Sequence, residues 1–228
     1  MKAAAKSTAG PSPARLGDGT HATALAPRQA SLAALRKTAA GCQACELWKH
    51  ATQTVFGEGG SKATLMLIGE QPGDKEDLAG HPFVGPAGRI LDTALQEAGI
   101  ERRNVYVTNV VKHFKWAPQE RGKRRIHKKP RQSEIEACRP WLEAEIRVVS
   151  PEVLVCLGAT AAQSLLGKTF SVMRDRGKVM ASQFGSKIVA TVHPSSILRA
   201  QDDESRRAQM QAFIDDLQTI STLIHKGE

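Results

Sequence analysis

The chain has 228 residues, of which 41% are hydrophobic, and it carries a formal net charge of +9 at neutral pH. This length suits one domain of moderate size with a sizeable core. The positive charge favours a polyanionic partner such as nucleic acid, although many basic proteins do not bind DNA. The sequence has no apolar run of the ~18 residues that a membrane span needs, which argues against a membrane protein.

The first 30 residues are rich in Ala, Ser, Gly and Pro and lack the apolar core of a secretory signal. Because such a segment buries too little apolar surface to fold, we expect a disordered leader over residues 1–30 and a single domain over residues 31–228. Four cysteines without a secretory signal fit a reducing cytoplasm. We therefore expect a cytoplasmic protein, associated with the bacterial nucleoid.

Past the leader, helical and strand patterns alternate along the chain. A first helical pattern ends near Gly41. Apolar, β-rich runs predict strands at 63–70, 104–111, 152–159 and 186–195. Helical patterns lie at 87–99, 133–150, 160–167 and 203–225. Continuous apolar strands alternating with helices predict a three-layer α/β/α fold with a central, mainly parallel sheet.

Polar residues follow the predicted strands directly. The first strand runs into Gly-Glu-Gln at 69–71, the second ends in Thr-Asn at 108–109, and the last runs into His-Pro-Ser at 193–195. Ligands of open parallel sheets bind at the carboxyl ends of the strands. We therefore expect two carboxamides, a carboxylate and a histidine to converge on one polar pocket.

The stretch "GEQPGDKEDLAGHPFVGPAG" (69–88) follows a strand and is rich in glycine and proline. Glycine lets the backbone approach a ligand closely, and a following helix start offers free N–H groups. The stretch matches neither GxGxxG nor a Walker loop, so a nucleotide cofactor is not supported. Phe83 in this polar loop is suited to stacking on a planar ring, or it simply anchors the loop.

Three motifs, in this order and spacing, resemble the uracil-DNA glycosylase superfamily: "GEQPG…GHPFVGPAG", "YVTNVVKH" and "VHPSSILR". The match is closest to the iron–sulfur type called family 4. "GEQPG" together with "KRRIH" resembles the UdgX subgroup, whose members excise uracil and then stay covalently attached to the DNA. The resemblance spans about residues 40–220. It implies a glycosylase-like fold and a DNA-repair enzyme that cleaves the uracil N-glycosidic bond.

The resemblance implies roles for the residues of the predicted pocket. Asn109 should read the Watson–Crick edge of uracil, and Phe83 should stack on the flipped base. His193 should bond uracil O2 and stabilise charge on the leaving base. The resemblance also implies that Gly69, Gln71 and Asp74 contact the substrate. Glu70 and Gln71 occupy the region where another branch carries a water-positioning aspartate, so simple water activation is in doubt.

The segment 112–133 is longer than an ordinary connection and holds the basic run "RGKRRIHKKP". Its cations favour phosphate contacts, and we expect these residues to hold the DNA backbone: Lys123, Arg124, Arg125, Lys128 and Ser195. A single histidine in a basic loop usually has no catalytic role, but the "KRRIH" match implies that His127 attacks the sugar. Glu70 would orient its ring or take its second proton. Neighbouring cations should keep the imidazole neutral.

Cys42 and Cys45 form a C-x-x-C pair, a typical pair of metal ligands. The resemblance implies a structural [4Fe–4S] cluster held by these two cysteines, His113 and Cys138. Cys156 is the alternative fourth ligand, but it lies in an apolar strand, where cysteine acts as a small hydrophobe. Zinc fits a Cys₃His set equally well on spacing alone. Only the resemblance favours iron–sulfur.

Three functions remain open at this level. The first is a glycosylase that excises uracil and traps the abasic sugar on His127. The second is an ordinary multiple-turnover glycosylase, and the third is a non-catalytic binder of uracil-containing or abasic DNA. For the first, we expect a monomer that accepts uracil-containing DNA, including single strands, and releases free uracil, with no membrane partner.

Overall fold

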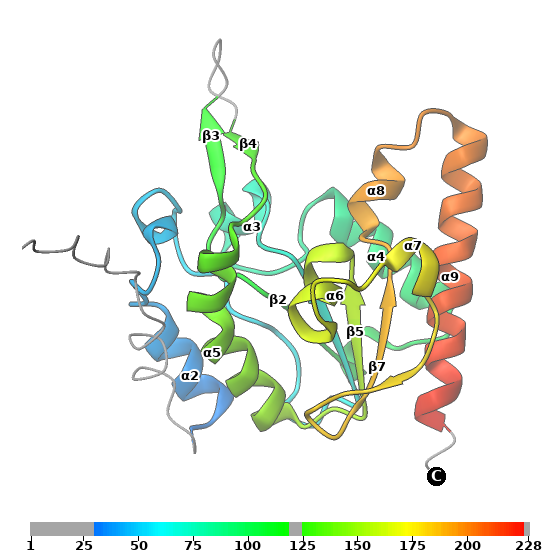
Figure 1. The fold of residues 1–228 in the computed structure, drawn as a ribbon, viewed down its shortest axis with the longest axis horizontal. Helices are drawn as coiled ribbons and strands as arrows, with labels where there is room; N and C mark the ends of the chain where they lie inside the picture. Colours follow the sequence, from blue (N-terminus) through cyan, green and yellow to red (C-terminus); the bar gives the residue numbers. More distant parts are fainter. Residues whose placement is uncertain (1–29, 119–124, 226–228) are drawn as a thin grey trace, which may run out of the picture.

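The computed structural model describes residues 30–118 and 125–225 (Figure 1). The leader predicted over residues 1–30 therefore lies outside the described residues except for Ala30. Lys123 and Arg124, two of the predicted phosphate contacts, also lie outside them.

A five-stranded sheet forms the centre of the molecule, with spatial order β2-β1-β5-β7-β6. Its strands are β1 (Leu65–Gly69), β2 (Val105–Asn109), β5 (Val153–Leu157), β6 (Met180–Ala181) and β7 (Lys187–Thr191). All neighbours are parallel except β6, which pairs antiparallel with β7 at the edge. The register pairs Gly69 with Asn109, so the ends of β1 and β2 lie side by side.

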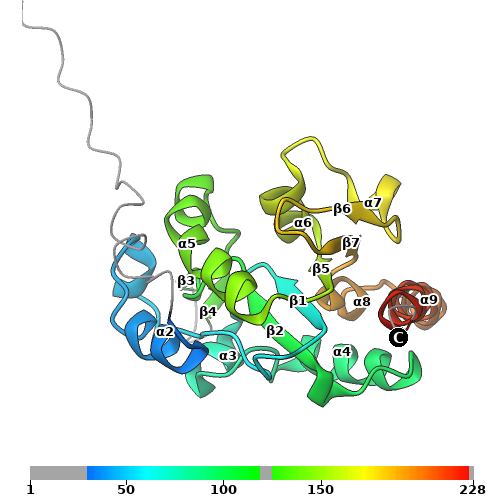
Figure 2. The same ribbon diagram turned by 90° about the horizontal axis from the view of Figure 1, so that it is seen from below.

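Helices cover both faces of the sheet (Figure 2). One face packs against α2 (Leu32–Ala39), α5 (Gln132–Val149) and α6 (Ala159–Leu166). The other packs against α4 (Pro86–Glu97), α8 (Pro194–Leu198) and α9 (Asp203–His225). The predicted three-layer α/β/α fold is confirmed. Within the described ranges, no helix has the length and apolarity needed to cross a membrane.

Alternate residues of each strand enter two different cores. In β1, Met66 and Ile68 pack with α2, α5 and α6, whereas Leu65 and Leu67 pack with α4, α8 and α9. Every residue of β1 is buried as a result. A strand covered on both faces reads as an unbroken apolar run, which is why the sequence indicated these strands correctly.

Two segments expected as loops contain regular structure. Helix α3 (Asp74–Ala79) forms inside the glycine-rich stretch 69–88. The long segment 112–133 holds an antiparallel hairpin of β3 (Trp116–Pro118) and β4 (Arg125–His127). The hairpin stands at the end of the sheet where β5 and β7 terminate (Figure 1). Strands this short show no readable periodicity.

The remaining short elements connect the larger ones. They are the 3₁₀ helices η1 (Glu46–Lys49) and η2 (Arg102–Asn104) and the single-turn helix α7 (Val172–Asp175). Helix α7 lies between α6 and the edge strand β6. Its residues Val172 and Met173 line the groove described below.

Candidate active site

A groove of about 1510 Å³ lies at the carboxyl ends of the parallel strands. This is the position at which open α/β sheets bind ligands. The strand-end residues that the sequence suggested for one rim line it together, and two loop residues join them: Glu70, Gln71, Asn109, His193 and Ser195 from the strand ends, with Phe83 and His127. The groove therefore combines polar side chains from three strand ends with one histidine from the hairpin.

Asn109 ends β2 and is only 3% exposed. Its carboxamide lies against Gly69, where a Cβ atom would collide with Asn109 Oδ1 and with the ring of Phe83. Among the described residues, no hydrogen bond engages this carboxamide. It therefore offers an unengaged donor and acceptor to a molecule in the groove.

Phe83 and His193 form an aromatic wall of the groove. Their ring centroids lie 6.1 Å apart with an interplanar angle of 28°. Phe83 has a φ of 58°, which is rare for a bulky residue. Gly88 permits this turn, because a Cβ there would overlap the carbonyl of Phe83. Backbone strain of this kind concentrates at binding and catalytic sites.

His193 is held as a neutral ring with a defined tautomer. The backbone N–H of Ser195 donates to His193 Nδ1 at 3.1 Å, so Nδ1 carries a lone pair. Burial, helped by the nearby His127 and Arg199, lowers the pKa of His193 to about 4. The ring proton therefore sits on Nε2, which makes this atom a neutral donor. The Ser195 hydroxyl lies 2.8 Å from His193 Nδ1, and its expected contact with a DNA phosphate stays a prediction.

His127 lies on β4 with a side chain that is 49% exposed. Its Nε2 is 2.9 Å from Gln71 Nε2. The Gln71 amide is oriented by backbone, because Nε2 donates to the carbonyls of Lys115 and Lys128 while Oε1 accepts from Lys115 N–H. Gln71 Nε2 thus has two hydrogens for three acceptors, and His127 Nε2 shares one of them when it carries the lone pair.

Glu70 approaches the same imidazole nitrogen, with Oε1 3.7 Å from His127 Nε2. The Thr160 hydroxyl, in the first turn of α6, donates to Glu70 Oε2. Partial burial lowers the pKa of His127, Glu70 opposes this and Arg199 adds to it. The ring is therefore neutral at pH 7. Thr160 was missed in the sequence, although it stands just past the end of a predicted strand.

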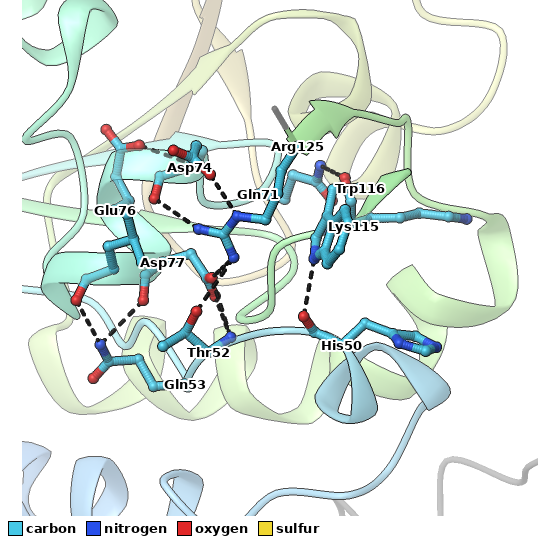
Figure 3. A network of polar contacts seen from close by, with 12 residues as sticks. His50, Thr52, Gln53, Gln71, Asp74, Glu76, Asp77, Lys115, Trp116 and Arg125 are labelled. Carbon is cyan, nitrogen blue, oxygen red and sulfur yellow. Dashed lines mark hydrogen bonds and ion pairs between the residues drawn. The ribbon is translucent and has the colours of Figure 1, made fainter. Parts of the chain in front are cut away.

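Arg125, predicted to contact a DNA phosphate, forms ion pairs with two aspartates (Figure 3). Its Nε lies 2.5 Å from Asp74 Oδ1, and its Nη1 lies 2.5 Å from Asp77 Oδ2. The guanidinium also lies over the rings of Phe114 and Trp116, at 5.3 and 5.6 Å. Arg125 and Asp74 thus tie β4 to α3. Both residues also line the groove, and the phosphate and substrate contacts expected of them stay predictions.

Three of the four cysteines influence one another. Burial raises the pKa of Cys138 to about 12, Lys112 opposes this rise, and Cys45 and Cys42 add to it. Cys42 Sγ accepts from the indole N–H of Trp141 at 3.2 Å. By contrast, burial alone raises the pKa of Cys156 to about 12. The chemistry of three neighbouring thiols, of which Cys42 and Cys138 are buried and Cys45 is half-buried, fits an iron–sulfur cluster. Across the described residues, no group of three or more His, Cys, Asp or Glu has the geometry of a metal site.

His113 follows β2 and is 4% exposed. Its Nε2 lies 2.8 Å from the Thr54 hydroxyl, which itself donates to the carbonyl of Ala39. The hydroxyl therefore accepts from Nε2–H, which leaves the lone pair on Nδ1. Burial lowers the pKa of His113 to about 4. A neutral imidazole with one nitrogen fixed by an outer hydrogen bond has the usual form of a metal-ligating histidine.

Comparison with known proteins identifies the family. A model of the uracil DNA glycosylase superfamily matches residues 56–218. The Type-4 uracil-DNA glycosylase of Thermotoga maritima is 38% identical over 186 residues, covering 81% of this chain and 90% of the relative. That of Sulfurisphaera tokodaii is 36% identical over 176 residues, covering 74% and 76%. The Type-5 enzyme of Pyrobaculum aerophilum is 27% identical over 184 residues, covering 73% and 76%.

Proposed function

Because this chain belongs to the uracil-DNA glycosylase superfamily, we propose that it is a DNA-repair glycosylase that excises uracil and then bonds the sugar to His127. The observation that carries the covalent step is the position of His127 Nε2. It is 2.9 Å from Gln71 Nε2 and 3.7 Å from Glu70 Oε1, beside the groove that Asn109 lines. The substrate is uracil-containing DNA, with single strands accepted, and the chain acts as a monomer.

Recognition of the base is assigned to Asn109, Phe83 and His193. The unengaged carboxamide of Asn109 accepts from uracil N3–H and donates to O4, whereas cytosine inverts both groups. Phe83 stacks on the flipped base. The Nε2–H of neutral His193 donates to O2, where charge builds as the glycosidic bond breaks. The tautomer that Ser195 imposes on His193 supports this role.

The covalent step conserves atoms and charge. The C1′–N1 bond breaks and its electron pair leaves with uracil, which yields an oxocarbenium-like sugar. The lone pair of His127 Nε2 then bonds C1′, and the resulting imidazolium releases its Nδ1 proton to solvent. The uracil anion takes up a proton. Proximity favours this histidine over water, since a held nucleophile has a very high effective concentration.

Glu70 is assigned to charge stabilisation beside the sugar. Its carboxylate lies 3.7 Å from His127 Nε2, the attacking atom, which supports stabilisation of the imidazolium that forms when Nε2 bonds C1′ rather than removal of the Nδ1 proton. A negative charge there also stabilises the developing positive charge on C1′. Thr160 holds the carboxylate in this position.

A direct test of the proposed function uses one uracil-containing oligonucleotide. Free uracil should appear, and a heat- and detergent-stable protein–DNA species should appear with it on a denaturing gel. Free uracil without that species would identify an ordinary multiple-turnover glycosylase. Binding without free uracil would identify a non-catalytic binder.

Gly69→Ala should slow uracil excision on the order of 10²-fold, because a methyl group there displaces both Asn109 and Phe83. The matched control is Gly60→Ala, since a Cβ at Gly60 has no atom nearer than 3.9 Å. Single-turnover excision rates and thermal melting of both variants give the comparison. Equal rates for the two variants would contradict the close approach of Gly69 and Asn109 as a requirement for catalysis.

The cluster is proposed as [4Fe–4S], with ligands Cys42, Cys45, His113 and Cys138. It would supply a structural cross-link between the N-terminal segment, the end of β2 and α5. The neighbouring thiols and the free Nδ1 of His113 support this ligand set. Cys156 is left out because burial is the sole cause of its pKa shift.

The purified protein should be brown and contain about four irons per chain. Cys138→Ala should remove the iron and His113→Ala should make it labile. Cys156→Ala, a change at an equally buried cysteine, should leave the iron content unchanged. Metal analysis and the visible spectrum give the result without any activity assay. Stoichiometric zinc in place of iron would overturn the assignment.

A further inference from the structure

A buried ion pair lies behind Asn109, in the core between the sheet and α5. Lys112 Nζ is 2.5 Å from Glu145 Oε2, and the two side chains are 1% and 0% exposed. Lys112 follows Asn109 by three residues, whereas Glu145 comes from the C-terminal half of α5. Neither side chain lines the groove, so neither touches DNA directly.

Every hydrogen of the Lys112 ammonium group has an acceptor. Besides Glu145, Nζ donates to Thr108 Oγ1 at 2.6 Å and to the backbone carbonyl of Asn109 at 2.6 Å. Glu145 in turn accepts from the Tyr106 hydroxyl, the Thr108 hydroxyl and the Gly57 N–H. The network is fully satisfied, and such buried networks specify one arrangement of the groups that they join.

Stability alone is a poor reason for this pair. Removing two charges from water costs free energy that their attraction offsets only in part, so a buried pair is weak evidence for stabilisation. Its better supported use is to fix a unique geometry. Here the fixed group is the carbonyl of Asn109, the residue whose carboxamide has no hydrogen bond of its own among the described residues.

We propose that the Lys112–Glu145 pair positions Asn109 for uracil recognition. Lys112 holds the backbone carbonyl of Asn109 by a hydrogen bond, while the backbone of Gly69 lies against the Asn109 carboxamide. Asn109 cannot use its carboxamide for anchoring if that group is to bind the base. Its backbone must therefore carry the constraint. Lys112 and Glu145 are positioning residues in this scheme. The inference rests on the proposed reading role of Asn109.

The same lysine also contacts a proposed cluster ligand, because Lys112 N–H donates to Cys138 Sγ at 3.2 Å. This contact comes from the backbone, so a change of the Lys112 side chain leaves it in place. Iron content therefore serves as an independent measure that the surroundings of Cys138 are intact. Uracil recognition is then measured in protein that keeps its cluster.

The test is the charge-neutral double variant Lys112→Met/Glu145→Gln. The new glutamine oxygen still accepts from Tyr106, Thr108 and Gly57, but the donation to the Asn109 carbonyl is gone. Uracil excision should slow roughly ten- to hundredfold, the cost of a small misplacement of a binding group. Affinity for the same oligonucleotide with a stable abasic analogue, iron content and melting temperature should stay close to wild type.

Tyr106→Phe is the matched control within the network. It removes the hydrogen bond from the Tyr106 hydroxyl to Glu145 but keeps the contact between Lys112 and Asn109. We expect lower stability with an unchanged excision rate. If Tyr106→Phe slowed excision as much as the double variant does, the pair would be a stability element and the proposal would fail.

Combination with Asn109→Ala separates the possible failures. If the pair acts through Asn109, adding the double variant to Asn109→Ala should give no further loss of rate, whereas independent effects would add and overturn the proposal. If the double variant excised uracil at the wild-type rate while Asn109→Ala was impaired, the positioning role of the Lys112–Glu145 pair would be wrong and the role of Asn109 would stand. If Asn109→Ala excised uracil at the wild-type rate, both the recognition role of Asn109 and this inference would be wrong.

A second variant covers the case in which the first does not fold. Lys112→Gln/Glu145→Gln keeps a polar partner for the residue at 145, but its amide ends one bond short of the Lys112 ammonium. It should show the same selective loss of uracil excision. Wild-type excision in this variant would overturn the proposal.

Discussion

Asn109→Ala is expected to slow uracil excision on the order of several hundredfold or more, while affinity for abasic DNA changes little. The carboxamide is 3% exposed and unengaged among the described residues, so its two hydrogen bonds to uracil form in a site shielded from water. Truncation leaves N3–H and O4 of the base without partners in that site. The loss should therefore appear in the chemical step and in base choice.

Single-turnover excision and binding to an abasic analogue measure the two effects separately. Asn104→Ala is the control, because Asn104 is exposed and its side chain bonds only Glu101 within the described structure. That variant should excise uracil at the wild-type rate. Near-unchanged uracil release by Asn109→Ala would remove Asn109 from the reading role.

His127→Ser is expected to abolish the stable protein–DNA adduct while uracil is still released. Water then captures the oxocarbenium-like sugar, which turns a single-turnover reaction into multiple turnover. The serine side chain is shorter, so it cannot reach the position of His127 Nε2 between Glu70 and Gln71. A denaturing gel measures the adduct, expected at about one per chain in wild type from the single nucleophile, and free uracil is measured in parallel.

His81→Ser is the matched control, since His81 is an exposed histidine that pairs with Glu58 and does not line the groove. It should form the adduct as wild type does. Persistence of the adduct in His127→Ser, or its absence in wild type, would leave His127 without a covalent role.

The pH dependence of adduct formation provides a second check on the same residue. The attacking form is the neutral imidazole, and burial lowers the pKa of His127 below the usual value of about 6.5. Adduct formation should therefore keep its full rate at pH 7. It should decline only as the pH falls below that usual value, because protonation then removes the lone pair.

The sequence alone determined the fold class and the main polar residues at the strand ends that line the groove. The strands β1, β2, β5 and β7 are buried on both faces, and strands of this kind have sequences that are unbroken apolar runs. Parallel strands place their carboxyl ends at one edge, so the polar residues that follow these runs had to meet. Glu70, Asn109 and His193 were found in this way.

Only the tertiary structure decided how the side chains pair. Arg125 looked like one more cation in a basic run, yet Asp74 and Asp77 bind it once α3 and the hairpin come together. The Lys112–Glu145 pair joins residues 33 positions apart along the chain. No local pattern predicts such partners, because periodicity reports which face a residue occupies and not what faces it there.

The physical reason for this division is the range of the forces involved. Burial of apolar surface acts on every residue of a strand or helix, and it leaves a repeating signal that can be read without a structure. A hydrogen bond or ion pair depends on one atom lying within about 3 Å of another. That distance is set by the packing of separate elements, so the orientation of Gln71 toward His127 became visible only in the folded chain.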